Sequence, residues 1–105
     1  MVQNIRRKAS DPEQAKRLHK VVQVFDGLVD MNKRLPAQDA SQIRHRAGLV
    51  AAAWIAADGA GLEDADERRD LLLKTLYTRA RELGIDPREA NIGYKEGLTN
   101  PRLTH

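Results

Sequence analysis

The stretch AGLVAAAWIAA, residues 47–57, holds eleven consecutive residues without a charged, amide or hydroxyl side chain, in a chain of which 31% is charged. A membrane-spanning helix needs about 20 apolar residues. This stretch is bounded by Arg44 and Arg46 before it and by Asp58 after it. We therefore expect no membrane span but a buried helix. A helix that is apolar on every side must be covered on every side, which places it at the centre of a bundle or against a second copy.

A long helix is predicted before this stretch, over residues 11–34. Its apolar residues recur at three-and-four spacing, which puts them on one stripe, and Ser10 is suited to cap its first turn. Pro36 ends it, because the ring disfavours helical geometry at the preceding residue. Asp39 or Ser41 is then expected to cap the central helix.

A third helix is predicted after the stretch. Gly59 and Gly61 give the sequence DGAG the backbone freedom of a turn, Asp64 or Asp66 starts the helix, and Gly84 closes it. A short fourth helix is expected from about residue 87 to residue 96.

These elements predict an all-α fold, an antiparallel three-helix bundle with a short fourth C-terminal helix. We expect a single domain over residues 1–105, with a basic N-terminal arm at 1–10 and a loosely held tail at 97–105. The expected core comprises Leu18, Val22, Phe25, Val29, Ile43, Ala47, Val50, Trp54, Leu72, Leu76 and Leu83.

The sequence contains no arrangement typical of an enzyme. There is no cysteine, and Ser10 and Ser41 both occupy expected capping positions. His19, His45 and His105 have no second histidine or acid at a spacing that would place two metal ligands on one helical face. We therefore expect no catalytic residue, no cofactor, no metal site and no small-molecule substrate.

Another protein is the expected partner. Lys16, Lys20, Arg44, His45 and Arg46 are the candidate partner-facing residues, chosen for charge and expected exposure. Two segments of opposite charge support a protein partner. Residues 1–20 carry six Lys/Arg and two acids, net +4, and residues 58–70 carry six acids and two Arg, net −4. Such asymmetry steers partners, although it is also typical of ordinary solvated faces.

A ridge of small side chains is predicted along the central helix. Gly48, Ala52 and Ala56 are four residues apart and allow a neighbouring helix to approach closely. The ridge is either an intramolecular packing seam or the contact face of a homodimer.

Nucleic acid is the alternative partner. Arg6, Arg7 and Lys8, continued by Arg17 on the first helix, can contact phosphates without reading bases. A helix-turn-helix motif is disfavoured, because the first turn of its second helix would bring acidic side chains close to the phosphates of the DNA major groove. The sequence thus predicts a small cytoplasmic, non-enzymatic regulatory or assembly protein that binds another protein. One version of this prediction is a protein that acts as a homodimer. The alternative is nucleic-acid binding.

Overall fold

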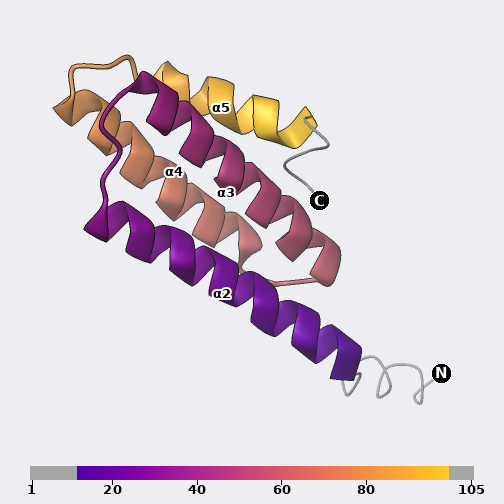
Figure 1. Cartoon of the computed structure of the whole chain (residues 1–105). Helices are drawn as coiled ribbons and strands as arrows, with labels where there is room; N and C mark the ends of the chain where they lie inside the picture. The colour runs from indigo at the N-terminus through magenta and orange to yellow at the C-terminus, as the bar shows by residue number, and fades with distance from the viewer. Residues whose placement is uncertain (1–11, 100–105) are drawn as a thin grey trace.

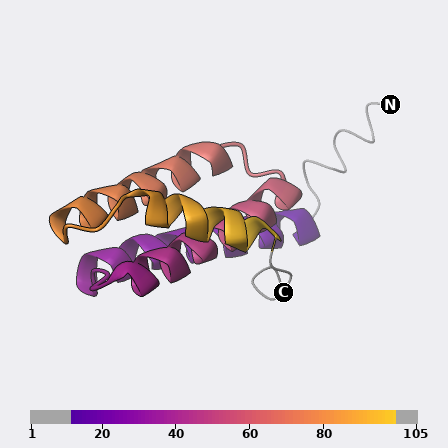
Figure 2. The same cartoon turned by 90° about the horizontal axis from the view of Figure 1, so that it is seen from above.

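The computed structural model describes residues 12–99. These residues form four helices, α2 (Pro12–Arg34), α3 (Ala40–Ala60), α4 (Ala65–Glu82) and α5 (Arg88–Thr99), and no strand. The all-α prediction is confirmed. Consecutive helices run in opposite directions (Figure 1). Figure 2 shows α4 on one side of the layer that α2 and α3 form, with α5 in front of α3.

Helix α3 lies at the centre of the fold and contacts each of the other three helices. Ile43, Ala47, Val50 and Ala57 on this helix are completely buried. Their burial removes apolar surface from water, worth roughly 25 cal/mol for each square ångström. The predicted burial of the stretch 47–57 is therefore confirmed over most of its circumference.

The ends of α3 and α4 are fixed by local hydrogen bonds. The Asp39 carboxylate accepts a hydrogen bond from the Gln42 backbone N–H at 2.9 Å, so Asp39 and not Ser41 caps α3. Gly61 (φ 81°) and Gly84 (φ 71°) adopt the left-handed conformation after α3 and α4, which glycine reaches without a Cβ clash. Gly59 lies inside α3, so the turn depends on Gly61 alone.

Helix α5 packs directly on the backbone of α3. A Cβ atom at Gly97 would stand 2.7 Å from the Gly48 carbonyl oxygen and 2.8 Å from the Ala51 Cβ. One at Gly93 would collide with the backbone of Arg44. The two glycines, four residues apart on one face, thus bring the helix axes closer than larger side chains would allow.

This contact corrects the predicted tail. Residues 97–99 belong to α5 and Gly97 is buried, whereas the sequence placed them in a loosely held segment that began at 97. The rest of that segment, 100–105, and the predicted arm at 1–10 with the Ser10 cap lie outside the described residues.

The predicted core is partly right. Phe25, Ile43, Ala47, Val50, Leu72 and Leu76 are buried, and Leu18, Val22, Trp54 and Leu83 are half-buried. The assignment of Val29 to the core is wrong, because 39% of its surface is exposed. Val21, Phe25 and Leu28 form the buried stripe of α2 instead, so the helix is rotated relative to the predicted face.

We expect Gly97→Ala to be less stable than Gly27→Ala by about 1–3 kcal/mol, because the added methyl group at residue 97 overpacks the α3–α5 contact. Gly27→Ala is the matched control, since no atom lies within 4 Å of its added Cβ and alanine favours the helix by about 1 kcal/mol. Urea unfolding of both variants measures the difference. Equal effects of the two substitutions would contradict the close contact.

Candidate partner-binding surfaces

The predicted partner-facing residues of α3 point to different neighbours. Arg44 Nε forms an ion pair with Glu89 Oε1 of α5 at 2.8 Å, and Arg46 Nη1 donates to Asn32 Oδ1 of α2 at 3.1 Å. His45, between them in sequence, is exposed. The two arginines therefore join helices of this chain, and His45 is left facing solvent.

Arg44 and His45 also line a polar hollow of about 550 Å³ beside the α3–α5 contact, together with Ser41 and Glu96. The ion pair with Glu89 already gives the Arg44 guanidinium a counter-charge. This hollow has few apolar side chains with which to hold a protein partner.

Lys16 and Lys20 lie at the opposite end of the molecule from Arg44. The Gln14 side-chain amide donates to the Ala60 carbonyl, which places the first turns of α2 beside the last turn of α3. Both lysines are exposed, without an ion pair to any residue of the described range. The structure thus separates the five predicted partner-facing residues into two groups.

The residues predicted to contact phosphate are only partly described. Arg17 is exposed on α2 and its Nη2 donates to Gln14 Oε1 at 2.8 Å. Arg6, Arg7 and Lys8 lie outside the described residues.

The small-residue ridge of α3 is covered unevenly. Gly48 is buried under Gly97 of the same chain, Ala52 is half-buried, and Ala56 is exposed. The first residue of the ridge is therefore an intramolecular seam, and only the part around Ala52 and Ala56 is open to another molecule.

An apolar groove between α2 and α4 is the surface that the sequence did not predict. Its volume is about 550 Å³, and Val29, Pro36, Ala37, Leu71 and Leu72 line it. Leu71 is 65% exposed and Val29 is 39% exposed. The sequence feature that could have indicated this groove is the run of three leucines that begins at Leu71. Consecutive residues point about 100° apart around a helix, so the three leucines cannot all face one core.

Four charged side chains line the same groove. Arg79 Nε donates to the Ala37 carbonyl oxygen at 2.7 Å, and its Nη1 pairs with Glu82 Oε1 at 3.3 Å. Lys33 on α2 and Lys74 on α4 are exposed and have no ion pair within residues 12–99. The uncompensated charge at the groove is therefore positive.

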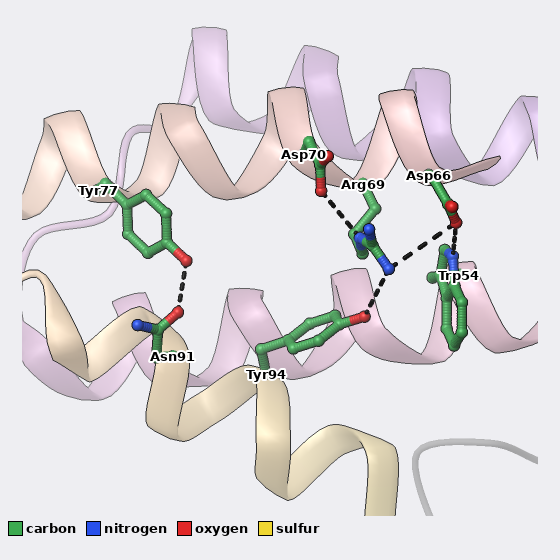
Figure 3. A network of polar contacts seen from close by, with 7 residues as sticks. All are labelled: Trp54, Asp66, Arg69, Asp70, Tyr77, Asn91 and Tyr94. Atoms are coloured by element: carbon green, nitrogen blue, oxygen red, sulfur yellow. Dashed lines mark hydrogen bonds and ion pairs between the residues drawn. The ribbon is translucent and has the colours of Figure 1, made fainter. Parts of the chain in front are cut away.

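A polar network joins α3, α4 and α5 on another side of the molecule (Figure 3). Arg69 lies over the Trp54 ring, 5.2 Å from its centroid, and its Nε bonds Asp70 Oδ1 at 2.9 Å. Trp54 Nε1 donates to Asp66 Oδ1 at 2.7 Å, and Arg69 Nη1 lies 3.4 Å from the Tyr94 hydroxyl. These groups partner one another, so we assign the network to holding the helices together.

The Tyr77 hydroxyl extends this network by donating to Asn91 Oδ1 of α5 (Figure 3). Burial raises the pKa of Tyr77 above its ordinary value, and the neighbouring charge of Asp70 and the Tyr94 phenol add to the effect. The neutral phenol is thus the form that fits between α4 and α5.

Tyr77→Phe is expected to reduce the loss of stability at high pH. A raised folded-state pKa gives stability that is present below the ordinary tyrosine pKa of about 10 and is lost as pH rises through the folded value. Urea unfolding of both proteins from about pH 8 to about pH 11 measures this. Identical pH dependence of the two would contradict the assignment. At neutral pH the variant should lose about 1 kcal/mol or less with the Asn91 hydrogen bond.

Neither a metal site nor a similarity to a known protein points to further functional residues in the described range. In the described part of the chain, no group of three or more His, Asp or Glu side chains is arranged to hold a metal ion. Over the same residues, no helix combines the length and the apolar character that crossing a membrane requires. Comparisons with protein-family models, with curated proteins and with solved structures found no match for the chain.

Proposed function

We propose that this chain is a small, non-enzymatic regulatory or assembly protein of the cytoplasm that acts by binding another protein. The apolar groove between α2 and α4 carries the proposal. The proposed grouping of the helices is an antiparallel three-helix bundle of α2, α3 and α4, to which α5 adds the short fourth helix. The cytoplasm is proposed because the chain has no cysteine, as is common in reducing compartments.

The groove has the physical properties of a protein-binding surface. Val29 and Leu71 expose apolar side chains toward one hollow, and complete burial of such a side chain stabilises a complex by about 1.5–3 kcal/mol. Arg79 fixes the loop at one end of the groove through the Ala37 carbonyl. Less conformational freedom is then lost on binding.

A homodimer is included in the proposal. The open part of the α3 ridge, Ala52 and Ala56, presents small side chains on which a helix of a second copy would pack closely. This surface is separate from the residues that line the α2–α4 groove.

Leu71→Asp is expected to abolish partner binding without unfolding the chain, because the side chain is 65% exposed. Val24→Asp is the matched control, since Val24 is 49% exposed on α2 and does not line the groove. Wild-type and both variant proteins serve as baits in extracts of the source cells, with and without nuclease treatment.

The expected result is a protein that wild type and Val24→Asp retain, that Leu71→Asp loses, and that nuclease does not release. Equal capture by all three baits would contradict the groove. Loss of the captured protein on nuclease treatment would favour the alternative function.

Nucleic-acid binding is the second candidate function. Its support is the pair Lys16 and Lys20, which are exposed one helical turn apart on α2 and have no ion pair with any residue from 12 to 99. Arg6, Arg7 and Lys8 precede them in the sequence, and such a row can follow a phosphate backbone.

For this alternative we expect a gel shift of DNA or RNA that weakens steeply with salt. Replacing Arg6, Arg7 and Lys8 by alanine should flatten the salt dependence, because fewer counterions are then released. Lys33→Ala with Lys74→Ala is the control for general loss of positive charge. The absence of a shift at low salt would exclude this function.

A further inference from the structure

We infer that the groove between α2 and α4 binds an acidic amphipathic helix of a partner protein, an inference that rests on the proposed function. The groove lies between two helices and is lined by Val29 on one, Leu71 on the other, and Leu72 and Ala37. An amphipathic helix presents one apolar stripe, which fits a channel of this kind.

The charge of the partner follows from the two lysines at the groove. Arg79 and Glu82 compensate each other at 3.3 Å. The nearby Asp30 is paired with Arg34 at 3.1 Å. Lys33 and Lys74 therefore remain without a counter-charge in the described range, one on each wall of the groove. Acidic residues beside the apolar stripe of the partner would pair with both.

The same charge disfavours the other occupants. The ends of this chain beyond the described residues carry Arg6, Arg7, Lys8 and Arg102, with Asp11 as the single acid. In a symmetric dimer formed through this groove, each copy would bring Lys33 and Lys74 to the interface. Like charges at an interface oppose association, so an acidic helix from another protein is the occupant that complements the groove.

The test uses three synthetic peptides of about 18 residues, or five helical turns. They share one leucine stripe and carry glutamate, glutamine or lysine at the flanking positions. Fluorescence anisotropy of labelled peptides measures their binding to the full chain. We expect the glutamate peptide to bind about tenfold more tightly than the lysine peptide, the scale of a few exposed ion pairs. The difference should shrink as salt screens the charges.

Charge reversal supplies the decisive comparison. Lys33→Glu with Lys74→Glu should reverse the order of the peptides, so that the lysine peptide binds most tightly. Lys16→Glu with Lys20→Glu changes the net charge equally at two exposed positions of α2 that do not line the groove, and should preserve the order. All four lysines are exposed, and circular dichroism verifies that both variants fold. Leu71→Asp should weaken the binding of every peptide.

Each contrary outcome has a defined meaning. If the glutamine or lysine peptide binds wild type as tightly as the glutamate peptide, the acidic partner is wrong while protein binding in the groove stands. If no peptide binds, the helical occupant is wrong, and the capture experiment with Leu71→Asp judges the proposed function separately. A dimer mass by light scattering that Leu71→Asp reduces to the monomer mass would show a second copy in the groove and overturn the inference.

Discussion

The close contact between α3 and α5 is the constraint on which the rest of the structure depends. The stretch 47–57 of helix α3 is apolar on every side, so most of its sides need a cover. Helix α5 supplies one of them by setting Gly93 and Gly97 against the backbone around Gly48. Each glycine weakens the isolated helix by about 1 kcal/mol relative to alanine. A helix of 12 residues is also marginal alone, so α5 owes its stability to the packing that its glycines permit.

The position of α4 follows from contacts made elsewhere and leaves the groove open. Leu72 and Leu76 are buried in the core, Arg79 bonds the loop carbonyl of Ala37, and Arg68 reaches Asp26 of α2 at 3.5 Å. These interactions hold α4 without closing the space in front of Leu71. The groove is thus a product of the fold, present before any partner arrives.

The sequence predicted the helices and most of their ends, because those depend on local chemistry. Asp39 caps the first turn of α3, and Gly61 and Gly84 adopt the left-handed conformation that follows α3 and α4. The extent of α5 was not predictable in this way. Gly93 and Gly97 weaken a helix by intrinsic propensity, and only the neighbouring backbone turns them into a packing surface.

The candidate site was harder to predict than the fold. Periodicity gives the apolar stripe of a helix but not its rotation, so Val29 was assigned to the core and proved exposed. The importance of Lys33 and Lys74 depends on which two helices leave a space between them, which is a property of the whole packing. Arg44 and Arg46 were predicted to face a partner because of their charge. In the structure both arginines instead contact residues of the same chain.

The order of the helices along the chain has a consequence for biosynthesis. Helix α3 precedes α5 in the chain, so the residues around Gly48 are synthesised before the helix that covers them. Partly made chains with uncovered apolar surface are the species that aggregate and that chaperones bind. We therefore expect the yield of folded protein in a cell to depend on protection of the α3 surface until α5 is made, as well as on the stability of the folded chain.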